Sequence, residues 1–120
     1  MTMHDIGNRP AQATLTITAG DHWSRTPTLT GIDLTGCSLR GQMRKTAAGA
    51  TIAPIECSIT NASTGAMLWE LDVPSDIGGC GARDPDSQYV GEIELVDSLG
   101  KIRTLLRLTI IVIAEAARAA

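Results

Sequence analysis

The chain has 120 residues, a formal net charge of −3 and a pI near 5.2, which is the size of one domain and gives no basic field for nucleic acid. Hydrophobic residues make up 43% of the chain, but there is no Phe, one Tyr and two Trp, so the core must be mainly aliphatic. The longest apolar run, residues 110–114, is far shorter than the roughly 20 residues that a membrane helix needs. We therefore expect neither nucleic acid nor a membrane as a partner.

The chain begins with a polar lead over residues 1–12, after which the pattern changes. Leu15 and Ile17 alternate with threonines, which is typical of a half-buried strand. A turn at residues 19–21 follows, and residues 24–30, rich in Thr and Pro, favour extended, loosely paired backbone. The lead has neither the basic region nor the apolar run of a secretory signal peptide, so we expect synthesis in the cytoplasm.

The middle of the chain predicts three strands. Residues 36–45 alternate between an apolar and a polar face. Residues 50–60 also alternate, but Pro54 has no N–H to donate, which predicts a sheet edge or a bulge there. The sequence NASTG at residues 61–65 is typical of a hairpin turn and leads into a third alternating stretch, residues 67–72.

Two long alternating stretches, residues 88–96 and 101–113, close the domain, with a tight turn between them at residues 97–100. The second of these stretches is predicted to have one apolar face, made by Ile102, Leu106, Leu108, Ile110 and Val112. Its other face begins with charged residues but ends with Ile111 and Ile113. This end is apolar on both sides, so we expect another segment or another chain to cover it.

About six or seven strands joined by turns, with no helix of ten residues, predict an all-β domain. We expect one antiparallel β-sandwich over residues 13–113. It is flanked by the flexible lead and by a short C-terminal tail, residues 114–120, which is helix-prone or frayed.

Residues that commonly bind metals are few and scattered. Cys37, Cys57 and Cys80 lie far apart without CxxC spacing, and the only histidines are His4 and His22. A zinc site needs four ligands, usually supplied in closely spaced pairs. We therefore expect no metal or other cofactor, and three free thiols in a reducing compartment.

Two features have the residue types of enzyme sites without the required context. His22 lies between Asp21 and Trp23 at a predicted turn, where a solvated histidine is commoner than a catalytic base. Residues 78–81, with the sequence GGCG, lack the GxxxxGK[ST] spacing and the following helix of a phosphate-binding loop. We interpret them as a flexible loop.

The acidic residues have structural explanations as well. Residues 84–87, with the sequence DPDS, offer oxygen ligands but lack the twelve-residue loop and closing Glu of a calcium site. Glu92 and Glu94 are expected to face Arg103 and Arg107 across a hairpin, where cross-strand ion pairs account for them. No catalytic constellation remains, so we expect a protein that is not an enzyme.

Several turn and strand signatures occur in a set order. They are GDHW at residues 20–23, IDLTG at 32–36, a strand ending in MRK at 43–45, Y-x-x-x-I-x-L at 89–95, DSLG at 97–100, and a final apolar strand. This layout resembles that of small bacteriophage and prophage structural proteins, namely the N-terminal attachment domains of baseplate upper proteins and tail-fibre adaptors. The resemblance covers about residues 15–113.

The resemblance implies an immunoglobulin-like β-sandwich that serves as a docking unit in a virion, after synthesis in the bacterial host cytoplasm. Its partners would be other virion structural proteins, and the chain would form a homo-oligomer or a multi-copy assembly in a tail, baseplate or fibre attachment. Baseplate upper proteins continue into a long receptor-binding or fibre region, whereas this chain stops at Ala120. We therefore expect an anchoring part, a separate small adaptor, or a capsid decoration protein.

The longest irregular stretch, residues 74–87, is a candidate contact loop, because long loops in small domains are often functional. Such loops and flexible ends can become ordered on assembly. The residues expected to contact partners are Gly78, Gly79, Cys80, Gly81, Arg83, Asp84, Asp86, Ile111 and Ile113.

A small β-sandwich module that binds a carbohydrate or another ligand is the alternative function. It requires an exposed cluster that includes Trp23, Trp69 or Tyr89. Trp69 and Tyr89 alternate with apolar neighbours, which instead predicts core positions.

Overall fold

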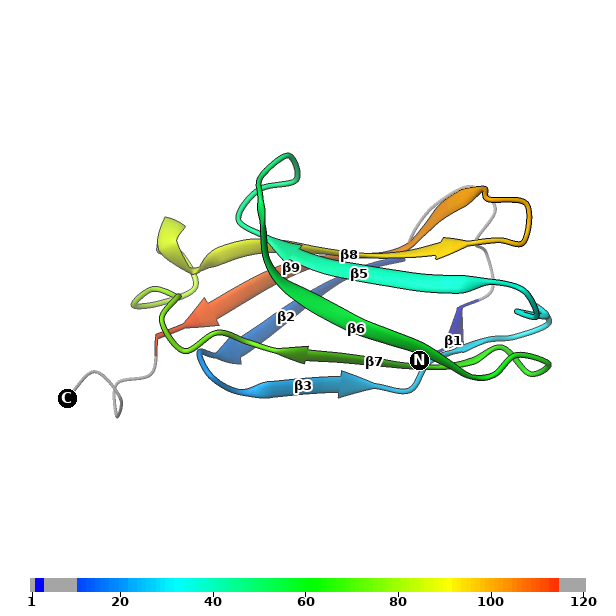
Figure 1. The fold of residues 1–120 in the computed structure, drawn as a ribbon. Coiled ribbons are helices and arrows are strands. Elements are labelled where there is room, and N and C mark those ends of the chain that lie inside the picture. The colour runs from blue at the N-terminus through cyan, green and yellow to red at the C-terminus, as the bar shows by residue number, and fades with distance from the viewer. Residues whose placement is uncertain (1, 4–10, 115–120) are drawn as a thin grey trace.

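The computed structural model describes residues 2–3 and 11–114, and the regular secondary structure of these residues is β-strand except for one short 3-10 turn (Figure 1). The strands are β1 (Thr2–Met3), β2 (Ala11–Thr18), β3 (His22–Arg25), β4 (Thr28–Leu29), β5 (Ser38–Arg44), β6 (Thr51–Asn61), β7 (Ala66–Asp72), β8 (Gln88–Val96) and β9 (Ile102–Ile113). A 3-10 turn, Pro85–Ser87, precedes β8. The prediction of an all-β domain is confirmed, and seven of the described strands have four or more residues.

The predicted lead and tail lie largely outside the described residues, because residues 1, 4–10 and 115–120 are not described. Within the predicted lead, β1 pairs with β4 in parallel, and β2 begins at Ala11. The stretch predicted to be loosely paired contains the end of β3 and all of β4, which are four and two residues long.

The strands form one mixed sheet in the order β1-β4-β7-β6-β5-β8-β9-β2, with β3 also paired to β7. The prediction of an antiparallel arrangement is wrong, because β2 runs parallel to β9 over the full length from Ala11 to Thr18. An alternating sequence identifies a strand but not its neighbour, and these two strands come from opposite ends of the domain. Their relative direction was therefore not encoded in either strand's own pattern.

The sheet curls at β6, so the part of the sheet before β6 and the part after it enclose the core between them. Residues 51–55 of β6 pair with β5, whereas residues 56–61 pair with β7. Pro54 lies in the first half, opposite Gln42 of β5. The prediction of an edge or bulge at this proline is confirmed locally: the β5–β6 register shifts between Met43 and Arg44, opposite residues 51–53, and this half of β6 has a paired strand on one side only. The strand as a whole lies between β5 and β7.

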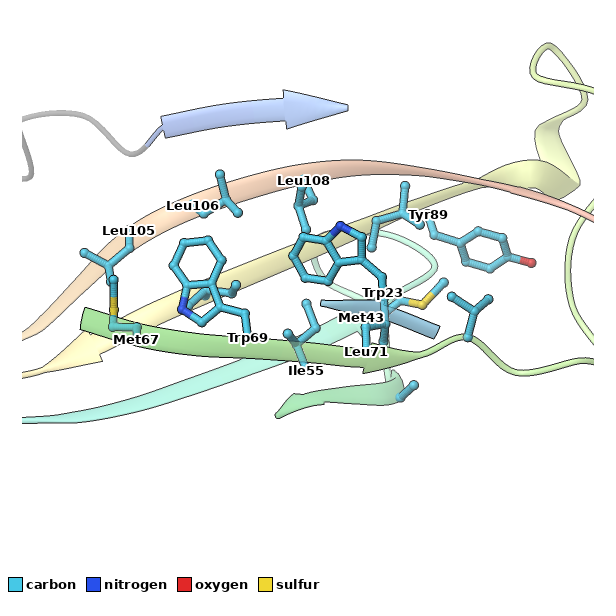
Figure 2. Packing of buried hydrophobic residues seen from close by; sticks show 14 of the residues in the cluster. Trp23, Met43, Ile55, Met67, Trp69, Leu71, Tyr89, Leu105, Leu106 and Leu108 are labelled. Carbon is cyan, nitrogen blue, oxygen red and sulfur yellow. The ribbon is translucent and has the colours of Figure 1, made fainter. Parts of the chain in front are cut away.

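The core inside the curl is built from aliphatic side chains around two tryptophans. Figure 2 shows the rings of Trp23 on β3 and Trp69 on β7 lying toward Leu106 and Leu108 of β9. Trp69 is fully buried, and Trp23 and Tyr89 are each only 7% exposed. The prediction that Trp69 and Tyr89 are core residues is confirmed.

A bulge in β9 changes which residues point inward. Ile93 of β8 pairs with Leu106, but Glu94 pairs with Thr104, so Leu105 is an extra residue in β9. Leu105 and Leu106 are both buried as a result, and Ile102 is 52% exposed. The predicted inward position of Ile102 is therefore wrong, because strict alternation cannot anticipate a bulge.

Candidate interaction surface

The predicted contact loop is attached to the end of β9. Gly79 forms an isolated parallel bridge with Ile113: its N–H donates to the Val112 carbonyl at 3.1 Å, and its own carbonyl accepts from the Ala114 N–H at 3.0 Å. The neighbouring Gly78 has a φ of +108°. Gly79 thus pairs beside the last residue of β9, and this contact brings the predicted loop and the predicted apolar strand end together.

Asp84 closes the loop. Its carboxylate accepts hydrogen bonds from the backbone N–H groups of Cys80 and Asp86, each at 3.0 Å. The hydrogen bond from Cys80 is the main cause that lowers the pKa of Asp84, with the bond from Asp86 and the charge of Lys45 acting in the same direction. A side chain on Gly79 would collide with Asp84 and Ser87, so this loop geometry requires glycine there.

Two residues outside the predicted set hold the loop in place. Lys45 Nζ donates to the carbonyls of Pro85 at 2.5 Å and Gln88 at 2.9 Å, and it lies 4.4 Å from the centre of the Tyr89 ring. The Tyr89 hydroxyl accepts the Gly78 N–H at 3.2 Å. No local sequence pattern marks Lys45 for this role, because its partners are forty or more residues away.

The loop leaves polar and small side chains facing outward. Cys80, Arg83 and Asp86 are exposed, whereas Gly79 is buried. Ile111 and Ile113 are half-buried, and the segment around Gly79 lies beside the end of β9 through backbone hydrogen bonds. A loop of the same chain therefore meets this strand end at its edge, while the side chains of Ile111 and Ile113 stay partly exposed.

A groove of about 640 Å³ lies on the outer face of the sheet. Its floor is formed by β8, β9 and β2, and Ala47 of the β5–β6 hairpin lines one side. This hairpin rises above the sheet in Figure 1, and Arg44, at the end of β5, donates a hydrogen bond of 3.1 Å to the Ala47 carbonyl in its loop. The groove could not be predicted from the sequence, because strand alternation indicates a polar face but not which loop overhangs it.

The groove is lined mainly by polar or small residues, together with Val90 and Leu108. Arg107 and Glu92 form an ion pair of 3.5 Å, as expected from cross-strand pairing. The expected pairing of Glu94 with an arginine of β9 is wrong, because the bulge places Thr104 opposite Glu94. Glu94 instead accepts a hydrogen bond of 2.8 Å from Arg40 of β5.

One face of β9 joins the groove to the contact loop. Arg107 and Thr109 line the groove, and Ile111 and Ile113 follow on the same face at alternate positions. Ile113 then meets Gly79 of the loop. The groove, the end of β9 and the loop therefore form one continuous surface, which we call the β9 face.

A separate charged cluster lies on β3 and β7. His22 Nδ1 is 2.7 Å from Asp72 Oδ1, and His22 Nε2 is 3.3 Å from Glu70 Oε2. The hydrogen bond with Asp72 is the main cause that raises the pKa of His22, and the Glu70 charge adds to it. His22 is exposed, as expected, but it belongs to a strand instead of a turn.

The three cysteines are free thiols in different surroundings. Cys37 and Cys57 are half-buried and Cys80 is exposed. Burial raises the pKa of the Cys57 thiol to about 12, which makes it unreactive. Within residues 2–3 and 11–114, no three His, Cys, Asp or Glu side chains are grouped to bind a metal.

No known protein-family model matches the sequence, and comparison with curated proteins gives no significant match. The structure includes, over the residues that it describes, no helix with the length and apolar character needed to cross a membrane.

Proposed function

We propose that the chain is a non-enzymatic structural protein of a phage virion that works by docking to other virion proteins. The observation that carries this proposal is the continuous β9 face, on which the predicted loop residues and the predicted apolar strand end meet. A surface built from a groove, a strand and an anchored loop suits contact with another protein, because it combines half-buried apolar residues with a polar rim.

The proposed fold is an immunoglobulin-like β-sandwich, with β6 passing from one layer to the other. The split pairing of β6 supports this interpretation, as does a core enclosed by the two halves of the sheet. We propose that the module belongs to a tail, baseplate or fibre attachment, in line with the order of its turn signatures. A capsid decoration protein would use the same kind of surface.

The ligand-binding alternative has weaker support. Its aromatic platform would require exposed rings, but the two tryptophans and the single tyrosine are buried in the core. The groove has the volume of a ligand site, yet its side chains include no aromatic residue.

The proposal is tested on particles produced by the phage or prophage that encodes the chain. We expect mass spectrometry of purified particles to detect the chain in several copies per particle. Arg83→Ala in the exposed loop should lower its incorporation, whereas Arg103→Ala, an exposed arginine near the opposite end of β9, should not. Particles that assemble normally without the chain in them would overturn the proposal. Fractionation of the particles into tails and capsids would distinguish a tail component from a capsid decoration protein.

A further inference from the structure

β2 forms one end of the sheet and has an edge without a paired strand. β9 pairs with one side of β2, and no strand within residues 2–3 and 11–114 pairs with its other side. Alternate residues of a parallel strand direct their backbone N–H and C=O groups toward the neighbour, so the remaining residues of β2 direct theirs away from β9. The pairing with β9 is unbroken from Ala11 to Thr18, so this edge is long and regular.

The β2 edge lacks the features that usually prevent pairing with another chain. Such features are charged side chains, proline, bulges and very short length. The β2 sequence AQATLTIT contains no charged residue and no proline, it is eight residues long, and its register is continuous. Its threonines, leucine and isoleucine instead favour strand pairing.

The other stretches with a single paired neighbour carry such features: β1 has two residues, the first half of β6 contains Pro54, and the start of β9 contains Arg103 and the bulge. β3 has four residues, two of which are His22 and Arg25, and Pro27 follows it. The second half of β6 follows Pro54, contains Glu56, and has a register irregularity between Ile59 and Asn61. The lack of protection is therefore specific to β2.

The side chains of β2 are distributed as in a strand from the interior of a sheet, with one face on the core and one on the outside, but β2 has a neighbour on one side only. Ala13, Leu15 and Ile17 pack against the core but stay half-buried. The opposite face carries Gln12 and Thr14, which are exposed and line the groove. A strand added beside β2 would complete the burial of the first face and extend the second.

We propose that β2 pairs antiparallel with β2 of a second copy of this chain, across a twofold axis at Thr14 or Leu15. The proposal rests on the docking role proposed above and names a partner for it. The two half-sheets would join into one continuous sheet with β2 of each copy in its centre. Addition of a strand at an exposed edge is a common mode of recognition, and a twofold axis makes the contact self-complementary.

The sequence of β2 suits reversal on itself. With the axis at Leu15, the two Leu15 side chains meet at the centre, and on each side of them a small Ala13 lies opposite a large Ile17 of the other copy. On the outer face Thr14 lies opposite Thr16 of the second copy, a favourable cross-strand pair. No like charges meet in this arrangement, because the strand has none, and this absence of charge favours a second copy over a charged partner segment.

The test compares two double variants with the wild-type chain by sedimentation velocity, over concentrations from about 1 µM to about 1 mM, where weak self-association is measurable. Thr14→Lys/Thr16→Lys places lysines opposite each other whichever residue lies on the axis. Ser58→Lys/Thr60→Lys adds the same charge at two exposed positions on the protected half of β6. We expect a wild-type dimer that the β2 variant weakens by at least about tenfold in dissociation constant and that the β6 variant leaves unchanged.

Hydrogen exchange on the wild-type chain gives a second readout that does not depend on the variants folding. Amide protection in residues 11–18 should increase with protein concentration, since the outward N–H groups of β2 become bonded in the dimer. A monomer at every concentration, protection that does not depend on concentration, or equal weakening by both variants would overturn the proposal. Incorporation of the chain into particles is a separate measurement, so the docking role can hold even if this dimer does not form.

Discussion

His22 shows how residues fifty positions apart create a charged pair at the surface. Its imidazole lies between Asp72 and Glu70, and the hydrogen bond with Asp72 holds the pKa of His22 above its usual value of 6.5. Because the pKa is higher in the folded chain, the stabilisation is complete below the pKa of the unfolded chain. It is lost as the pH rises through the pKa of the folded chain.

We predict that Asp72→Asn lowers the pKa of His22 toward that of a free histidine, because it removes the main partner of the protonated ring. Titration of the His22 ring protons by NMR measures this change directly. Asp21→Asn removes a carboxylate next to His22 in the sequence and serves as the control, which should leave the pKa of His22 raised. Equal shifts in both variants would mean that general surface charge, not this contact, sets the pKa.

Trp69 tests whether the buried aromatic residues support the core or a binding platform. We predict that Trp69→Ala lowers the free energy of unfolding by about 3–5 kcal/mol, because it leaves a cavity where a fully buried ring was packed. Leu99→Ala, at a position 81% exposed, should change it by less than about 0.5 kcal/mol. Urea denaturation measures both values. A Trp69→Ala chain with wild-type stability would contradict the packing in Figure 2.

Among the elements, the β6–β7 hairpin depends on a glycine with little space around it. Gly65 has a φ of +80°, and a Cβ there would collide with the Leu29 carbonyl. Gly100, in the β8–β9 turn, has a φ of +83°, but a Cβ there would have no other atom within 4 Å beyond its chain neighbours. The two turns thus share a backbone conformation and differ in the room for a side chain.

This difference predicts unequal effects of the same substitution. Gly100→Ala should cost about 1–2 kcal/mol, the strain of a left-handed conformation alone. Gly65→Ala should cost about 3 kcal/mol or more, since steric overlap with the backbone adds to that strain. Thermal or urea unfolding of the two variants checks the order, and equal losses would mean that the backbone near Leu29 moves aside.

The contact loop depends on one carboxylate at its base. We predict that Asp84→Asn weakens the hydrogen bonds to the Cys80 and Asp86 N–H groups and increases amide exchange in residues 80–86. Asp86→Asn removes an equal charge from an exposed side chain and is the matched control. The pKa of Asp84 is lowered in the folded chain, so its contribution is present above the pKa of the unfolded chain and is lost as the pH falls through its folded value. Exchange that increases equally in both variants would contradict the role of Asp84.

The strands could be predicted from the sequence more completely than their arrangement. Alternation located β5, β7 and β8 and their inward faces, because side chains of a strand follow a period of two. It failed at Ile102, where the bulge shifts the period, and it could not place β2 beside β9. Of the site, the loop glycines and Ile113 were predicted, while Lys45 and the groove depend on contacts between distant segments.

At the scale of the whole molecule, the parallel pairing of β2 with β9 joins the first long strand to the last. Without β2, β9 would become the end of the sheet and would expose its edge beside Ile110 and Val112. We predict that a chain lacking residues 1–18 loses cooperative unfolding or aggregates, because an exposed apolar strand edge favours association. Circular dichroism during thermal unfolding measures the loss.

A synthetic peptide of residues 11–18 added to the truncated chain should restore the cooperative transition, since it can occupy the vacated side of β9. The same peptide with Leu15→Lys and Ile17→Lys should not, because both lysines would face the core that these residues pack against. A truncated chain that unfolds at the wild-type temperature would show that β2 is an accessory strand. Rescue by the first peptide alone would show instead that strand pairing at this edge stabilises the domain, the same kind of contact that the proposed dimer forms on the opposite side of β2.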